Sequence, residues 1–349
     1  MEILFATTKK HKKAIKKFRR DLYKNDLNYV STAEFTFDML LNKETAFARS
    51  IDISPVMCVS DNKIIITSLL IHNPADDFLQ VSFFEALDNI GDEVDEFIDF
   101  VRGVAKERQL NRIIIGLNGH LSYGVGLSVD MNCANTFDST YTKTYYIKYF
   151  EKYKKHELVA FSNKISVASQ SLFSKNSGIT IRKIDLNDFD NEMEKFRNIC
   201  DETIGKTFLY TQTDKKHYYD LLNDMTFFLK SENILFAEDN GTVVGFLFWH
   251  PDYNEILKKG KQNSLLTIAA RYTLLKNRIT KVKLNSIGVK DAYQGVVTIK
   301  LIYEMEKYVR KYDTIETNFV WVNNKKSMAI NKKLLQNVER HFAVYEVNV

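Results

Sequence analysis

The clearest candidate for a binding site is a short polar loop, Asp291 to Gly295, directly before the amphipathic segment 296–312. If that segment is a helix, its first N–H groups lack partners within the helix, and together with the helix dipole they favour an anion. A strand that delivers a loop to such a helix start suits a pyrophosphate, although the loop could equally be an ordinary turn. The residues that would surround the anion are Gln294, Gly295, Val296 and Val297, with Lys290 as an added positive charge.

Three polar side chains could act on a bound substrate. His250 is a candidate general base because imidazole titrates near neutral pH, although a single histidine is often structural. Asn285 and Ser286 lie together in the apolar segment 281–289, and neither accepts a proton near neutral pH. These two residues could instead hold a water molecule that relays a proton.

The elements that must position these residues follow from hydrophobic periodicity. Segment 281–289 reads as a strand, 296–312 as an amphipathic helix and 314–322 as a second strand. Asn324 then opens a further helix, because asparagine is a favoured residue before a helix start. The predicted order is therefore strand, loop, helix, strand, helix, with the polar loop at the start of the first helix.

This unit resembles the central motif of the GNAT acyl-CoA N-acyltransferase superfamily. In that family a strand ending in valine leads into a Tyr-Arg/Gln-Gly loop, and a later helix begins with Asn-x-x-Ser/Ala. The chain departs from the family at Val296, Val297 and Ile299, where further glycines are usual, and at Asn331, where a tyrosine is usual. The matching residues are Ile287, Gly288, Val289, Tyr293, Gln294 and Gly295 for the first motif, and Asn324 and Ser327 for the second.

The resemblance implies an acetyl-CoA or other acyl-CoA cofactor and direct attack of an amine on its thioester. The backbone of Ile287 and Val289 would pair with the pantetheine arm, and an N–H near Val289 would polarise the carbonyl. Asn324 would hold the same arm and Ser327 a phosphate oxygen. Many relatives carry a glutamate as general base on the strand where this chain has Asn285 and Ser286. No metal is implied.

The chain repeats its own pattern. Apolar runs meet at Asp61-Asn62 and again at Asp239-Asn240, a signal for β-hairpins, and a strand–helix–strand pattern follows in both halves. The resemblance therefore implies an α/β (α+β) fold of two tandem GNAT-like domains, each a twisted, mostly antiparallel sheet flanked by helices. We expect a degenerate N-terminal domain, 1–172, and a C-terminal domain, 178–349, with the better cofactor motif, joined by a polar seam between Ser171 and Gly178.

Net charge, cysteine spacing and the length of apolar runs narrow the class of protein but do not indicate the reaction. The 349 residues carry a net charge of +5, which suits an acidic cofactor as well as a nucleic acid. Three widely spaced cysteines argue against a disulfide framework, and no apolar run approaches the roughly 20 residues of a membrane span. We therefore expect a cytoplasmic protein, and we expect no DNA partner. The resemblance implies a small-molecule or peptide amine as acceptor.

Two alternatives stay open. The missing strand carboxylate, tyrosine and glycines fit a non-catalytic GNAT-like protein that binds CoA or serves as a scaffold. Transfer from aminoacyl-tRNA is the other, because some tandem GNAT folds do this and the segment Lys9 to Arg20 is basic, although a solvated first helix explains that segment as well. The sequence leaves the acceptor, the acyl length and the oligomeric state open.

Overall fold

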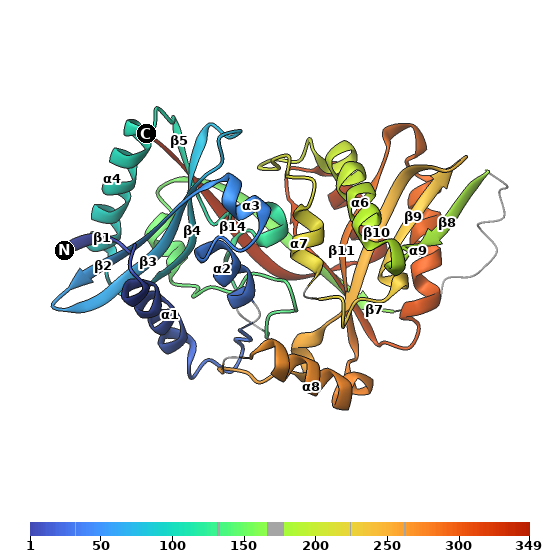
Figure 1. Ribbon diagram of the computed structural model, residues 1–349, viewed down its shortest axis with the longest axis horizontal. Helices are drawn as coiled ribbons and strands as arrows, with labels where there is room; N and C mark the ends of the chain where they lie inside the picture. Colours follow the sequence, from blue (N-terminus) through green and yellow to red (C-terminus); the bar gives the residue numbers. More distant parts are fainter. Residues whose placement is uncertain (32, 131–132, 166–177, 224, 262) are drawn as a thin grey trace.

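The structure is a computed structural model that describes residues 1–31, 33–130, 133–165, 178–223, 225–261 and 263–349. Its strands form one continuous sheet through the chain, in the order β1-β2-β3-β4-β5-β14-β7-β12-β11-β10-β9-β8 (Figure 1). The pairs β4–β5 and β11–β12 are parallel, and the other described strand pairs are antiparallel. The predicted α/β fold with a mostly antiparallel sheet is confirmed.

The first half of the chain, up to residue 165, begins with a strand and three helices before its hairpin. The turn of that hairpin holds Asp61 and Asn62 at φ 49° and 60°, the left-handed conformation that a two-residue hairpin requires. The elements are β1 (Glu2–Phe5), α1 (Lys9–Tyr23), α2 (Ala33–Leu41), α3 (Ala46–Ser50), β2 (Asp52–Ser60), β3 (Lys63–His72), β4 (Phe78–Ala86), α4 (Gly91–Glu107), β5 (Arg112–Ile115), η1 (Leu121–Tyr123), β6 (Leu127–Ser128), α5 (Tyr146–Phe150) and β7 (Lys154–Lys164).

The second half, from residue 178, repeats the order with an added helix, α8, before its central strand. Its hairpin turns at Asn240 and Gly241, again with positive φ. The elements are β8 (Ile179–Lys183), α6 (Phe189–Ile204), α7 (His217–Asn223), β9 (Ile234–Asp239), β10 (Thr242–Pro251), α8 (Leu265–Leu275), β11 (Lys281–Val289), α9 (Val296–Val309), β12 (Thr314–Thr317), β13 (Val320–Trp321), α10 (Lys325–Leu334) and β14 (Asn337–Asn348).

Side chains that alternate along β10 bury both faces of this part of the sheet. Phe246 and Phe248 pack in the cluster beneath α6, whereas Leu247 and Trp249 pack in the cluster beneath α9. Both helices also contact β10 and β11. The strand β11, which carries Asn285 and Ser286, is therefore packed against a helix on each face of the sheet. No described helix combines the length and apolarity that crossing a bilayer requires.

The halves exchange their last strands. β14 pairs with β5 of the first half, with Tyr345 opposite Ile115, and β7 of the first half pairs with β12, with Ile315 opposite Asn163. β14 and β7 also pair with each other, so the sheets of the two halves are joined at their centre. Figure 1 shows β14, in red, crossing from the second half into the first, where the C-terminal end lies near β5. The predicted seam, Ser171 to Gly178, lies outside the described residues except for Gly178, and the domain boundary stays a prediction.

A glycine allows the close approach of β14 to the first half. Gly126 has φ 91°, and a Cβ added to it would lie 2.6 Å from the Cβ of Phe342 on β14. Gly126→Ala is therefore expected to lower the free energy of unfolding by about 2 kcal/mol, from backbone strain and overlap together. Urea denaturation measures this, and Gly103→Ala in α4, where an added Cβ meets nothing, is the matched control. Equal midpoints for the two variants would contradict the packing.

Candidate functional site

β11 separates from its parallel neighbour β12 half-way along its length. The strands pair from Lys281 opposite Thr314 to Leu284 opposite Thr317, and the N–H of Asn318 then donates to the carbonyl of Leu284 at 2.9 Å. Beyond Leu284, β11 stays paired with β10 alone. The two parallel strands thus open into a split whose β11 side is lined by strand backbone.

A β-bulge sits where the split begins. Leu284 lies opposite Trp249 and Ser286 lies opposite Phe248, so Asn285 is the extra residue on β11. A bulge bends its strand and changes the direction of the side chain at that position. Here it brings Asn285 and Ser286, the predicted catalytic residues, to the wall of a cavity.

Beyond the bulge, alternate backbone groups of β11 face away from β10, on the side where the resemblance implies the cofactor arm. The N–H of Lys290 donates to the carbonyl of Val244 on β10 at 2.9 Å. Because successive residues of a strand face opposite sides, Ile287 and Val289 point their N–H groups away from β10, into the split. They can pair with an extended ligand that lies between the strands.

The start of α9, the predicted anion seat, lies next to this split. Gly295 caps the helix at φ 91°, the first turn holds no acidic residue, and no described side chain caps it. The N–H groups of Val296 and Val297 are thus available to an anion, and a Cβ added to Gly295 would meet nothing within 4 Å. The corresponding helix of the first half, α4, carries Asp92 and Glu93 in its first turn, which disfavour an anion.

Two lysines near the loop have different roles. Lys290, predicted to add positive charge, pairs instead with Glu202 at 2.9 Å. Lys326, in the first turn of α10, bonds through its Nζ to the side-chain oxygen of Gln294 and lies beside the α9 start. The Gln294 amide also donates to Asp291 at 2.8 Å. Lys326 is therefore a cation beside the predicted seat, and sequence reasoning missed it because only the fold joins α10 to this loop.

The start of α10 borders the same split. The side-chain oxygen of Asn324 accepts the N–H of Ser327 at 3.1 Å, so Asn324 caps the helix as its residue type indicates. Both residues also line the cavity, together with Asn331, whose amide donates to the carbonyl of Ser327 at 2.8 Å. Capping leaves the amide group of Asn324 for a ligand.

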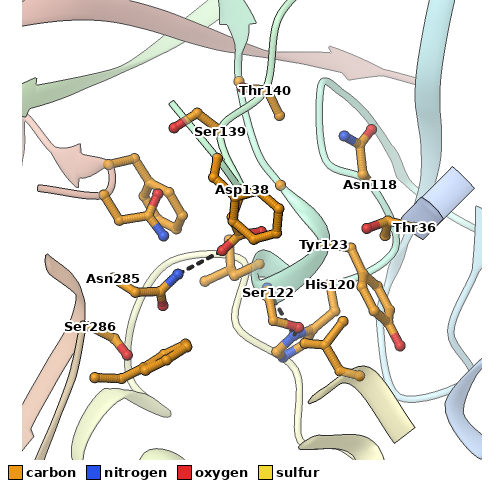
Figure 2. Close-up of a pocket in the computed structure, with 18 of the residues that line it drawn as sticks. Thr36, Asn118, His120, Ser122, Tyr123, Asp138, Ser139, Thr140, Asn285 and Ser286 are labelled. Carbon is orange, nitrogen blue, oxygen red and sulfur yellow. Dashed lines mark hydrogen bonds between the residues drawn. The ribbon is translucent and has the colours of Figure 1, made fainter. Parts of the chain in front are cut away.

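A cavity of about 540 Å³ lies between the two halves and opens onto the split. It brings together six predicted site residues from distant parts of the chain: Asn285, Ser286, Ile287, His250, Asn324 and Ser327. The remaining predicted residues, Val289, Gln294, Gly295, Val296 and Val297, lie along the end of β11 and the loop before α9, beside rather than within the cavity wall. The first half lines the opposite wall (Figure 2).

His250 lines this cavity as a neutral acceptor. Its side chain is buried, its Nδ1 lies 2.9 Å from the carbonyl of Pro251, and in the described part of the chain its Nε2 has no partner. Burial, with a smaller effect of Lys283, lowers the pKa of His250 to about 3. A carbonyl only accepts, so Nδ1 carries the proton and Nε2 offers a lone pair. Such an imidazole accepts a hydrogen bond well but is a weak base, and its predicted role as general base stays a prediction.

Asp138 of the first half brings a carboxylate to the side chain of Asn285 on β11. The amide of Asn285 donates to its carboxylate at 2.6 Å, the contact drawn in Figure 2. Burial raises the pKa of Asp138, while Lys283 and Asn285 act in the opposite direction. The residue has φ 63°, a left-handed conformation that is uncommon outside glycine and is found at functional sites. Its exposed surface faces the cavity, with protein around it.

Sequence reasoning did not find Asp138. It follows Phe137 in an irregular segment far from β11, and turn formation explains an aspartate there equally well. Only the strained backbone and the contact with Asn285 distinguish it, and both belong to the folded chain.

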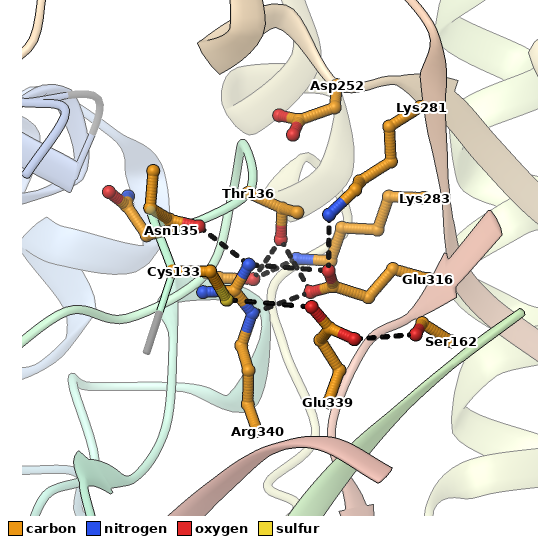
Figure 3. Close-up of polar contacts among 12 residues, drawn as sticks. Cys133, Asn135, Thr136, Ser162, Asp252, Lys281, Lys283, Glu316, Glu339 and Arg340 are labelled. Carbon is orange, nitrogen blue, oxygen red and sulfur yellow. Dashed lines mark hydrogen bonds and ion pairs between the residues drawn. The ribbon is translucent and has the colours of Figure 1, made fainter. Parts of the chain in front are cut away.

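A buried ionic network holds the Asp138 segment against the second half (Figure 3). Glu316 on β12 accepts from Arg340 on β14 at 2.9 Å, from Lys281 on β11 at 3.3 Å and from Thr136 at 3.1 Å. Burial alone would raise the pKa of Glu316, but Arg340 and Lys281 hold it below its ordinary value. Glu316 thus carries the negative charge between two cations where the exchanged strand meets both halves.

The same network fixes the segment on either side of Asp138. Lys283 donates to the carbonyl of Phe137 at 3.1 Å and to the hydroxyl of Ser139 at 2.9 Å. The N–H of Phe137 donates to Asp252 at 2.8 Å. With the residues on both sides bonded to β11 and to the end of β10, the Asp138 carboxylate is positioned by the second half.

Comparison with known proteins supports the fold. No protein-family model and no curated protein matches the chain. Among solved structures, a tandem GNAT protein from the clavulanic acid biosynthesis pathway matches with a TM-score of 0.50 and 9% identity, over 93% of this chain and 96% of that chain. A conserved protein of Enterococcus faecalis V583 described as a probable N-acyltransferase matches with a TM-score of 0.57 and 8% identity, over 100% and 72%.

A GCN5-related N-acetyltransferase from Sphaerobacter thermophilus matches with a TM-score of 0.50 and 11% identity, over 84% of this chain and 80% of that chain. At these identities the likeness concerns the fold. The likeness covers both halves of the chain. The solved structures therefore support the tandem fold that the resemblance of the sequence implies.

Proposed function

We propose that this chain, which has the tandem GNAT fold, is an acyl-CoA-dependent N-acyltransferase whose site lies in its second half. One observation carries the proposal. The split between β11 and β12 leads from an uncapped helix start, at Gly295, into the cavity where Asn285 meets Asp138. That arrangement offers an extended thioester a phosphate seat, a strand to pair with and an enclosed reaction space.

The donor, acetyl-CoA or another acyl-CoA, would lie along the split. Its pyrophosphate would accept from the N–H groups of Gly295, Val296 and Val297, with Lys326 as the nearby cation, whereas the predicted donor Gln294 already gives its N–H to the carbonyl of Asp291 at 3.4 Å. Its pantetheine arm would pair with the backbone of Ile287 and with the N–H of Val289, whose carbonyl accepts from the Gln294 amide at 3.4 Å, and Asn324 and Ser327 border the same path. A backbone N–H at the end of β11 polarises the thioester carbonyl.

The acceptor would be a small-molecule or peptide amine in the central cavity, whose volume is in the range of ligand sites. The amine nitrogen attacks the thioester carbon, the C–S bond breaks, and Asp138 takes the proton that the nitrogen loses. Asn285 holds Asp138 through its amide, and His250 accepts a hydrogen bond from the acceptor. Asn331 cannot act as an acid, so the departing thiolate takes its proton from solvent.

Gly295→Glu is expected to abolish acetyl-CoA binding, because a carboxylate at the α9 start repels the pyrophosphate and fills its seat. Calorimetric titration with acetyl-CoA measures this. Gly241→Glu is the matched control, since that glycine also has positive φ and open space around its Cα but lies in the β9–β10 turn. Binding by the wild type and by Gly241→Glu, and not by Gly295→Glu, supports the cofactor site.

If the wild type does not bind acyl-CoA, the chain is better described as a scaffold or as the user of another donor. Aminoacyl-tRNA gains little support from the basic helix α1. Lys16 pairs with Asp38 at 2.7 Å and Lys17 with Asp21 at 2.8 Å, and Lys12 donates to the carbonyl of Leu41. Part of the positive charge of α1 is thus paired within the fold.

A further inference from the structure

A second reactive group faces the same cavity from the first half. Ser122 lies in the short η1 helix, and its hydroxyl oxygen is 2.8 Å from Nδ1 of His120 and 2.8 Å from Nε2 of His217 (Figure 2). His120 precedes η1, whereas His217 begins α7 of the second half. Acyl transfer as proposed above uses none of the three. A serine held between two imidazoles is an arrangement that activates a nucleophile.

The hydrogen bonds determine where the protons lie. Nε2 of His120 is 3.0 Å from the carbonyl oxygen of Thr211, which can only accept, so Nε2 carries the proton and Nδ1 is a lone pair. The N–H of Ser122 also donates to that Nδ1, at 3.1 Å. Whichever nitrogen of His217 is protonated, the Ser122 hydroxyl therefore has an imidazole lone pair within hydrogen-bond distance to take its proton.

Both histidines stay neutral at physiological pH. Burial lowers the pKa of His120 to about 4, despite its bond to Thr211, and burial with repulsion from His120 lowers that of His217 well below its ordinary value. No residue that the structure describes bonds Nδ1 of His217. The rings of Phe47 and Tyr123 pack against the two imidazole rings. The centroid distances are 5.2 to 5.9 Å for three of the four ring pairs and 6.5 Å for His120–Tyr123. Ser122 itself is only half-buried and lines the cavity.

We propose that Ser122 is a second nucleophile of this protein and takes an acyl group from a carboxylic ester. Its oxygen attacks the ester carbonyl carbon, the hydroxyl proton passes to the adjacent imidazole, and the alkoxide leaves with that proton as the C–O bond breaks. Water then attacks the O-acylserine, gives its proton to the imidazole, and the imidazole returns it to Ser122. The products are a carboxylic acid and an alcohol, and no cofactor takes part.

Two probes test this on the full chain: labelling with a fluorophosphonate, located by peptide mass spectrometry, and hydrolysis of p-nitrophenyl acetate. The wild type is expected to be labelled at Ser122 and to release nitrophenol. Ser122→Ala is expected to lose labelling and to hydrolyse the ester on the order of a hundredfold more slowly. Ser60→Ala, at the end of β2 and outside the cavity wall, is the matched control. An unlabelled wild type, or equal labelling of Ser122→Ala, would overturn the proposal.

The pH dependence separates this role from a structural one. Since the base must be neutral and the pKa of His120 is lowered to about 4, labelling should largely persist at pH 5 and fall to half near pH 4. A loss near pH 6.5 would contradict the assignment to this histidine. Acetyl-CoA titration keeps the two proposals distinct, because Ser122→Ala should bind acetyl-CoA as the wild type does and Gly295→Glu should keep its ester hydrolysis.

Discussion

Asp138→Asn is expected to slow acyl transfer on the order of a hundredfold or more and to leave the affinity for acyl-CoA unchanged. The substitution keeps the shape of the side chain and can keep the contact with Asn285, because an amide oxygen accepts as a carboxylate does. What it removes is the group that accepts the proton of the amine. Steady-state rates with an amine acceptor, measured beside acetyl-CoA titration, test the separation of rate from binding.

The pH dependence of transfer gives a second readout for the same residue. Burial raises the pKa of Asp138 above its ordinary 3.8, and only the ionised carboxylate can act as a base. The wild-type rate should therefore fall as the pH drops through that raised value, and Asp138→Asn should lack this dependence. Asp130→Asn is the control, since Asp130 pairs with His341 at 2.6 Å and lies outside the cavity wall. A rate unchanged in Asp138→Asn would assign the base to another group.

Glu316→Gln is expected to lower the free energy of unfolding by about 3 to 5 kcal/mol. Glu316 is fully buried, and its loss leaves Arg340 and Lys281 without their anion in the interior. Urea denaturation at pH 7 measures the change. Lys17→Ala is the contrasting control, because the exposed Lys17–Asp21 pair contributes at most about 1 kcal/mol. A loss for Glu316→Gln as small as this control would contradict a dependence of stability on the network.

The fall in the free energy of unfolding at low pH should also differ between the wild type and Glu316→Gln. Since the folded pKa of Glu316 is lowered, its contribution is fully present above its unfolded value near 4.5 and is lost as pH falls through the folded value. Wild-type protein should therefore lose stability over that window, and Glu316→Gln should lose less. Unfolding midpoints collected from pH 7 down to pH 3 compare the two slopes.

Local pattern was enough to predict the parts of the site that one stretch of chain supplies. The strand 281–289, the turn to α9 and the cap at Asn324 each depend on neighbours within a few residues, so their residue types and spacing indicate them. The same holds for the Asp61-Asn62 hairpin, whose turn requires left-handed residues.

What could not be predicted depends on contacts between distant segments. Asp138 reaches Asn285, and His217 reaches Ser122, only because the two halves close on one cavity. Lys326 also reaches Gln294 only in the folded chain, because α10 packs beside the loop before α9. The exchange of β7 and β14 is the extreme case, since strands of equal apolar pattern fit either sheet and periodicity does not choose between them.

The exchanged strand also constrains the order of folding during synthesis. On the ribosome, β5 and β7 emerge well before β14, which at usual rates of translation follows by roughly ten seconds or more. Until then the nascent first half lacks the strand that pairs with β5 and β7, and unpaired strand edges are surfaces by which chains aggregate. The first half thus cannot complete its sheet until β14 is made. Binding of chaperones to the nascent chain should therefore be greatest while ribosomes translate the second half.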